Sequence, residues 1–126
     1  MKVRKRPVII DAWRVDEVRS AYINFSYKGI PEPLHAPIRG GVLLIDDRPG
    51  IEIRSLEGET TAEPGDWLMR GEEGEFYPCK PDIFDETYDF CPEYDVAERL
   101  IDGVLHERHF ENGEWVPKKF DEEPTE

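Results

Sequence analysis

Turn-forming residues are spread so evenly through this chain that few long helices or strands can form. Eleven prolines and ten glycines divide its 126 residues into short segments. Proline lacks a backbone N–H, and glycine reaches conformations that other residues avoid, so both tend to end regular elements or start turns. We therefore expect many short elements joined by tight connections, around a core of modest size.

The densest group of turn-formers and aromatic residues lies between Pro64 and Phe90. Its sequence predicts a turn at 64–66, a strand at 67–70 and a returning strand at 75–77. Pro78 is expected to end that ladder, because proline has no N–H to donate. Pro81 suits the first position of a short helix whose apolar face runs to Tyr88.

The first 40 residues predict one strand, one helix and a loop. Residues 7–15 carry apolar side chains on both faces, which is typical of a central strand with material packed above and below. Asp16 is expected to cap a helix that ends by Gly29, with one face formed by Val18, Tyr22 and Phe25. Three prolines predict an irregular loop over 30–38.

Two further strands are predicted at 42–45 and 51–56, around a turn at 46–50. The connections are too short for crossovers, so four or five antiparallel strands in meander order are expected. After Phe90, residues 92–102 have helical spacing, and Gly103 suits the position that follows a helix. A hairpin around Asn112-Gly113 is predicted next.

These elements predict an α+β fold: a small, mostly antiparallel, twisted sheet with one or two short helices. The expected organisation is a domain over residues 1–91 and a helix-and-hairpin extension over 92–120 that packs on it. Residues 121–126 are acidic and are expected to be disordered. No segment reaches transmembrane length, and the basic start lacks the apolar run of a signal peptide, so a soluble cytoplasmic protein is expected.

The net charge of −13 is unevenly distributed. Residues 1–50 hold nine Lys/Arg against six Asp/Glu, whereas residues 51–126 hold seven against twenty-three. Such a surface repels nucleic acid and attracts basic partners, including proteins that normally grip DNA. The alternative is that the acidity only keeps a small protein soluble. The basic residues 2–6 are interpreted as the exposed lead-in to the first strand, not as a nucleic-acid site.

No catalytic motif is present, and we expect neither a metal nor a cofactor. His106 and His109 would share a face on a helix, but on the predicted strand they point to opposite faces. Cys79 and Cys91 are too few for a disulfide framework and are expected to be reduced. Cys79 beside Lys80 leaves open a lowered thiol pKa, against the simpler role of a small packing residue.

The aromatic residues of the 64–90 stretch can form core, line a small-molecule pocket or supply a partner hot spot. With their polar neighbours they define the candidate binding residues, which are Trp67, Arg70, Glu75, Tyr77, Lys80, Asp82, Phe84 and Tyr88.

Two segments of the sequence resemble a family of small uncharacterised proteins of tailed bacteriophages and prophages. The first is the basic, strand-like Lys2–Trp13. The second combines Pro64-Gly-Asp-Trp-Leu68, Gly74-Glu-Phe-Tyr-Pro-Cys-Lys-Pro-Asp-Ile-Phe84 and Thr87-Tyr88. The resemblance implies a phage or prophage origin and a small cytosolic protein, and it brings no activity with it.

The leading hypothesis is a non-enzymatic accessory protein that binds a host or phage protein. A second hypothesis is sequestration of a nucleotide or similar small ligand, of the anti-defence type, for which Arg70 and Lys80 would supply the positive charge. A third is an acidic mimic that occupies a nucleic-acid-binding protein. An enzyme has no motif in its favour.

Overall fold

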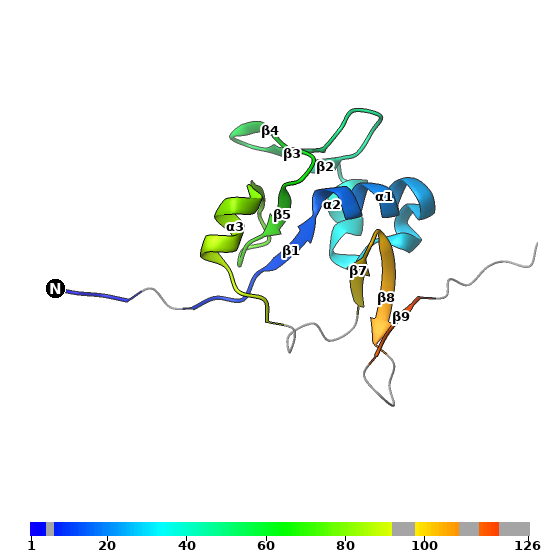
Figure 1. Cartoon of the computed structure of the whole chain (residues 1–126). Coiled ribbons are helices and arrows are strands. Elements are labelled where there is room, and N and C mark those ends of the chain that lie inside the picture. The colour runs from blue at the N-terminus through cyan, green and yellow to red at the C-terminus, as the bar shows by residue number, and fades with distance from the viewer. Residues whose placement is uncertain (5–6, 92–97, 109–113, 119–126) are drawn as a thin grey trace, which may run out of the picture.

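The computed structural model describes residues 1–4, 7–91, 98–108 and 114–118. Over these residues the α+β prediction is confirmed, with three α-helices and antiparallel pairing throughout (Figure 1). The single meander sheet is wrong: there are three separate three-stranded sheets, in the orders β1-β5-β6, β2-β3-β4 and β7-β8-β9. The strands are only two to five residues long, so each finds one or two neighbours before the chain turns away. No helix in the described ranges is long and apolar enough to span a membrane.

The first sheet has β5 (Trp67–Arg70) at its centre, between β1 (Asp11–Arg14) and β6 (Phe76–Cys79). The prediction of a long central strand over 7–15 is therefore wrong, because β1 is short and lies at an edge. The chain leaves the strand when the N–H of Val15 bonds to the carbonyl of Asp66 and the first helix begins.

The prediction that Pro78 ends the returning strand is also wrong. Pro78 pairs with Leu68 inside β6, which continues to Cys79. Since β6 is an edge strand of this sheet, a proline is tolerated where no N–H has to be donated to β5.

Helix α1 (Val15–Phe25) follows β1 directly and continues as the 3-10 helix η1 (Ser26–Gly29). Asp16 does not cap it; the Asp16 carboxylate accepts a hydrogen bond from the N–H of Gly65 at 3.2 Å. The buried stripe consists of Val15, Val18 and Ala21, whereas the predicted face residue Phe25 is exposed. The helix begins at Val15, two residues earlier than a cap at Asp16 would give, and Ala21 in place of Phe25 completes its buried stripe.

The loop predicted over 30–38 instead contains the 3-10 helix η2 (Glu32–Leu34) and helix α2 (His35–Arg39). Pro33 and Pro37 both lie in the first turns of these helices, where the N–H groups have no intrahelical partner to lose. Leu34 is fully buried and fixes this segment to the core.

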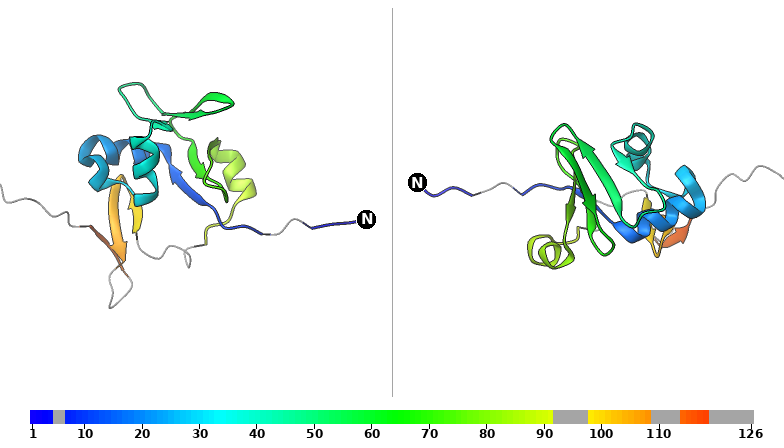
Figure 2. Two further views of the ribbon diagram at one scale, coloured as in Figure 1. Left: turned by 180° about the vertical axis from the view of Figure 1, so that it is seen from behind. Right: turned by 90° about the horizontal axis from the view of Figure 1, so that it is seen from above.

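The second sheet consists of β2 (Leu43–Leu44), β3 (Ile51–Ser55) and β4 (Gly58–Ala62). The predicted return of the chain over 51–56 is confirmed, although β2 is shorter than the predicted strand at 42–45. β3 and β4 continue beyond β2 as a two-stranded hairpin that projects from the molecule (Figures 1 and 2).

The third sheet consists of β7 (Glu98–Ile101), β8 (Val104–Arg108) and β9 (Trp115–Pro117). The helix predicted over 92–102 is wrong for residues 98–102, and residues 92–97 lie outside the described ranges. Asp102 and Gly103 both have positive φ, 52° and 76°, and form a two-residue turn between the paired Ile101 and Val104. Such a turn matches the twist of a hairpin, so it overrides the helical spacing.

The predicted final hairpin is partly described. β8 and β9 pair antiparallel as expected, while its Asn112-Gly113 turn and the acidic residues 121–126 lie outside the described ranges. Leu105 is buried and Leu100 packs against the main core, beside α1. The division of the chain at residue 91 stays a prediction.

Alternation along β5 divides the interior into two cores. Leu68 points to the larger core, whereas Trp67 and Met69 point to the opposite face of the sheet, which helix α3 (Pro81–Thr87) covers. The larger core contains Val15, Val18, Ala21, Ile30, Leu34, Leu43, Ile51, Ile53, Ala62 and Leu68. The smaller one contains Trp67, Met69 and Phe84, flanked by Ile10, Ala12, Tyr77, Cys79 and Tyr88.

Candidate partner-binding face

Four of the predicted binding residues are aromatic, and they pack mainly against one another. The Trp67 indole on β5 stacks on the Phe84 ring of α3, with centroids 4.0 Å apart and planes 10° from parallel. Tyr88 lies 5.4 Å from the Phe84 centroid. Only 8% of Trp67 and 4% of Phe84 is exposed. These rings therefore fill the space between β5 and α3 and hold the helix in place.

Tyr77 of β6 closes the same layer. Burial and a hydrogen bond with the Tyr88 hydroxyl raise the pKa of Tyr77 to about 12. Tyr77 is therefore neutral at physiological pH, and its hydroxyl is engaged within the protein. A role as an ionised or free recognition group is not supported by this geometry.

The predicted polar residues also have intramolecular partners. Arg70 Nη1 lies 3.4 Å from Asp11 Oδ2. Lys80 Nζ lies 3.1 Å from the Glu63 carboxylate and 3.2 Å from that of Asp66. Both cations that a nucleotide would need are thus already paired with carboxylates of this chain.

Glu75 and Asp82, the remaining predicted residues, are both exposed. The Glu75 carboxylate accepts a hydrogen bond from the N–H of Glu73 at 3.1 Å, so it stabilises the β5–β6 turn. Asp82 has no ion pair within the described part of the chain and points to a surface that the sequence reasoning did not single out.

Asp66 is a residue whose importance the sequence reasoning missed. The sequence pattern indicates only that it belongs to the Pro-Gly-Asp turn, yet it is the one charged residue among the described residues that is buried. Its carboxylate accepts a hydrogen bond from the N–H of Glu63 at 2.9 Å and pairs with Lys80 at the start of α3. It therefore ties the turn before β5 to α3, which is a structural role.

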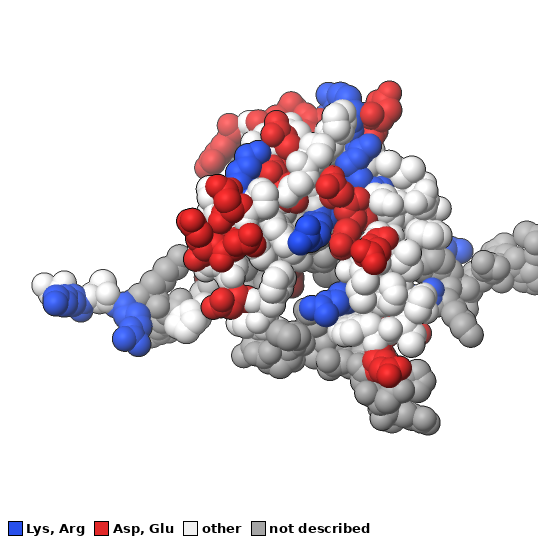
Figure 3. All heavy atoms as spheres, in the orientation of Figure 1, with Lys and Arg blue, Asp and Glu red and all other residues white. Residues whose placement is uncertain are grey.

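The exposed side of α3 carries a row of carboxylates. Asp82, Asp85 and Glu86 are spaced at i, i+3 and i+4, which places them on one face of the helix, and Asp89 follows. None of the four has an ion pair among the residues that the structure describes. Figure 3 shows acidic side chains gathered over α3 and the β3–β4 hairpin.

Two apolar side chains accompany this acidic row. Ile83 is 52% exposed and Phe90 is 66% exposed. The Phe90 ring lies 5.9 Å from that of Trp67 and 5.7 Å from that of Phe84, so the buried stack supports it from below. We call this surface the α3 face; its residues are Asp82, Ile83, Asp85, Glu86, Asp89 and Phe90.

The segment of the chain that contains most of the α3 face has a strongly one-sided charge. Residues 51–90 contain twelve Asp/Glu and three Lys/Arg. The three cations, Arg54, Arg70 and Lys80, all lie in ion pairs. Within residues 51–90 the carboxylates therefore outnumber the cations, and the nearby Arg14 guanidinium of β1 lies 4.9 Å from the centroid of the Trp67 ring.

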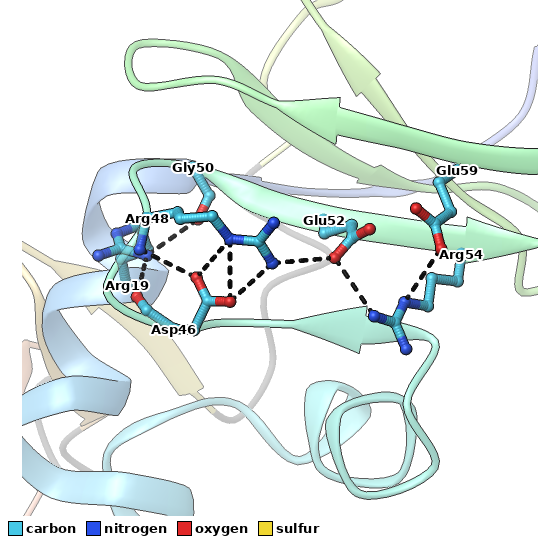
Figure 4. Close-up of polar contacts among 7 residues, drawn as sticks. All are labelled: Arg19, Asp46, Arg48, Gly50, Glu52, Arg54 and Glu59. Carbon is cyan, nitrogen blue, oxygen red and sulfur yellow. Dashed lines mark hydrogen bonds and ion pairs between the residues drawn. The ribbon is translucent and has the colours of Figure 1, made fainter.

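A second polar network lies on the β2–β3–β4 sheet (Figure 4). Arg19 of α1 donates to the backbone carbonyls of Asp46 and Gly50, at 2.9 and 3.0 Å. Arg48 pairs with Asp46 and Glu52, and it lowers the pKa of the Asp46 carboxyl through hydrogen bonds. The network fixes the 46–50 turn to the helix.

The thiol hypothesis is corrected by the geometry. Burial, followed by the nearby Asp66 and Asp82 carboxylates, raises the pKa of Cys79, so Lys80 does not activate it. Cys79 and Cys91 are both free thiols. His106 Nδ1 lies 2.8 Å from the carbonyl oxygen of Val104, and His109 falls outside the described ranges.

No group of three metal-ligating side chains occurs in the ranges that the structure describes. Comparisons with protein-family models, with curated proteins and with solved structures give no match.

Proposed function

We propose that this protein acts by binding, without catalysis, and that the α3 face contacts a basic protein. The observation that carries the proposal is the unpaired acidic row beside two exposed apolar side chains, on a helix held rigid by the Trp67–Phe84 stack. Apolar groups within a polar rim are typical of protein-binding surfaces. A rigid support lowers the entropy that is lost on binding.

The charge distribution supports a basic partner. A one-sided field accelerates encounter with an oppositely charged protein and disfavours partners of the same sign. We extend the proposal to a host or phage protein as the partner, to a phage or prophage origin and to a cytoplasmic location. These three parts rest on the resemblance of the two end motifs.

An acidic mimic that occupies a nucleic-acid-binding protein is the second candidate. The spacing of Asp82, Asp85, Glu86 and Asp89 favours it, because a row of uncompensated negative charges is what a phosphate-binding surface recognises. Sequestration of a nucleotide is less well supported, since the aromatic rings stack on each other and Arg70 and Lys80 are already paired.

Two double variants with the same change in net charge test the role of the α3 face. Asp85→Asn/Glu86→Gln changes the face, and Glu32→Gln/Asp47→Asn changes exposed carboxylates elsewhere. A protein captured from host lysate by the parent chain is purified, and its association with each variant is measured at several salt concentrations. We expect the α3 variant to associate about tenfold more slowly and the control to change much less.

Equal losses in both variants would mean that only net charge matters, and no loss in either would contradict the proposal. A DNA duplex that competes with the chain for the captured protein would favour the mimic. A nucleotide that raises the melting temperature of the chain by several degrees would favour sequestration instead.

A further inference from the structure

The distal part of the β3–β4 hairpin extends beyond the body of the protein. All residues from 54 to 61 are exposed, whereas Ile51, Ile53 and Ala62 at the base are buried. Ser55 continues the inward-facing series of Ile51 and Ile53, yet it is exposed, so the described body does not cover this part of the hairpin. We call residues 54–61 the β3–β4 arm; Figure 2 shows the hairpin in two further views.

The arm is held in shape by its own contacts. Ser55 pairs with Gly58 across a two-residue turn formed by Leu56 and Glu57. Ser55 Oγ donates to the carbonyl of Gly58 at 3.2 Å and accepts from the N–H of Glu57 at 3.3 Å. Below the turn, Arg54 lies 3.7 Å from the Glu59 carboxylate. The tip is thus ordered before any partner arrives, which lowers the cost of binding.

Leu56 at the tip is a fully exposed large apolar side chain. Apart from Gly58 and its two neighbours in the chain, no residue has an atom within 4 Å of the position that a Cβ on Gly58 would occupy, so there is open space beside the tip. Glu57 and Glu59 flank the leucine, and both are exposed. An apolar residue that is presented on a rigid turn and bordered by carboxylates fits an apolar recess with a basic rim.

We propose that the β3–β4 arm inserts Leu56 into such a recess on a basic protein. The inference rests on the proposed function for the class of partner and adds a contact separate from the α3 face. Charge complementarity selects this occupant: the net charge of −13 opposes a second copy of the chain, and anionic lipid headgroups would repel Glu57 and Glu59.

Photo-crosslinking with the full chain identifies what the tip touches. p-Benzoylphenylalanine is placed at position 56 and, as a matched control, at position 23 on α1, where Ile23 is 62% exposed. The captured protein is then purified, and its dissociation constant is measured with the parent chain and with Leu56→Ser, Leu56→Met and Ile23→Ser.

We expect crosslinking of a basic protein from position 56 and not from position 23. Leu56→Ser should weaken its binding about tenfold or more, as a central apolar anchor does, while Leu56→Met and Ile23→Ser leave it nearly unchanged. All three variants should melt close to the parent, because their side chains are exposed and do not belong to the core.

Several results would overturn this inference. They are crosslinking to a second copy or to lipid, no crosslinked protein at position 56, or binding that Leu56→Ser leaves intact. If Leu56→Ser has no effect while Asp85→Asn/Glu86→Gln slows association, the arm proposal fails and the α3 face stands. If neither variant affects binding, the proposed function fails as well.

Discussion

The two faces of the β1–β5–β6 sheet are packed in different ways. On the α1 side, ten buried residues, none aromatic, form one core to which α1, η2 and strands of two sheets contribute. On the α3 side, the buried layer consists of Trp67, Met69 and Phe84, with partly buried neighbours. One side is a deep aliphatic core and the other is a thin aromatic layer directly beneath an exposed helix.

This difference separates residues that stabilise the fold from the exposed residues for which we propose a role in recognition. A deep core is closed on all sides and can only stabilise the fold. In a thin layer the buried rings lie directly beneath the surface, so they contact exposed residues and can fix their position. Phe90, whose ring lies beside that of Trp67, is an example. The predicted binding residues Trp67 and Phe84 thus support the exposed residues of the α3 face, where we propose that a partner binds.

The largest effect is expected from Trp67→Ala, which removes the ring that joins β5 to α3. We expect a loss of about 3–5 kcal/mol in the free energy of unfolding, as for other large aromatic residues in cores. Phe90→Ala is the matched control, because it removes a mostly exposed neighbour of the same stack. Chemical denaturation of both variants measures the difference, and a Trp67 variant as stable as the Phe90 variant would contradict the packing.

Substitutions at two adjacent residues of β5 allow a direct comparison of the two sides of the sheet. Leu68 and Met69 are both fully buried, one in each core. We expect Leu68→Ala to cost about 4 kcal/mol and Met69→Ala about 2–3 kcal/mol, because a thin layer can relax into the cavity more easily than a closed core. Equal costs, or a larger cost at Met69, would mean that the aromatic layer is as rigid as the aliphatic core.

Substitutions in the β7–β8 turn test whether the third sheet packs against α1. Gly103 has a φ of 76°, and a Cβ there would lie 3.0 Å from Ser20 Oγ on α1. Gly65 has a φ of 89° with nothing near a Cβ, so Gly65→Ala reports the backbone cost alone, about 1 kcal/mol. We expect Gly103→Ala to lower the free energy of unfolding by about 2 kcal/mol, as measured by thermal unfolding. If the turn did not pack against α1, Gly103→Ala and Gly65→Ala would lower it equally.

The smallest effect concerns Glu17, which also faces this turn. Burial raises its pKa; the Arg14 and Arg99 guanidinium groups and the Asp102 N–H oppose the rise, while the Asp102 carboxylate adds to it. A carboxyl whose folded pKa lies above its unfolded value of 4.5 lowers stability as pH rises through that interval, because the folded state disfavours its ionisation.

Glu17→Gln should therefore melt slightly higher than the parent at pH 7, and the difference should disappear below pH 4.5. Glu86→Gln, at an exposed position on α3, is the control and should show no such pattern. A Glu17 variant that is less stable than the parent at pH 7 would show that the hydrogen bond with Asp102 outweighs the cost of burial.

Local signals gave the correct result where neighbouring residues decide the structure. The Pro64-Gly65-Asp66 turn, the β5–β6 hairpin and the helix beginning at Pro81 all depend on contacts within a few residues. At residues 98–102 two local signals conflict. The spacing of apolar residues favours a helix, whereas Asp102-Gly103 favours a hairpin turn, and the hairpin is what forms.

The candidate site was only partly predictable. Spacing placed Trp67 and Phe84 in one stretch, and the carboxylates of α3 have a readable helical period. The burial of Trp67 and Phe84 depends on how closely α3 packs against β5. The helix begins fourteen residues after the start of that strand, so no local sequence pattern predicts this packing. Leu56 appeared to continue a strand, and only the register of β3 and β4 shows that it occupies a projecting turn.

By itself, the sequence determined the turns, the short elements, the antiparallel pairing and the acidic second half, because backbone conformation and charge are properties of single residues and close neighbours. Only the tertiary structure decided which strand lies at the centre, which aromatic residues are buried and which carboxylates remain unpaired. These depend on burial and on pairing between distant segments such as Asp11 and Arg70, or Glu63 and Lys80. Such contacts form because the whole chain packs together, and no segment encodes them alone.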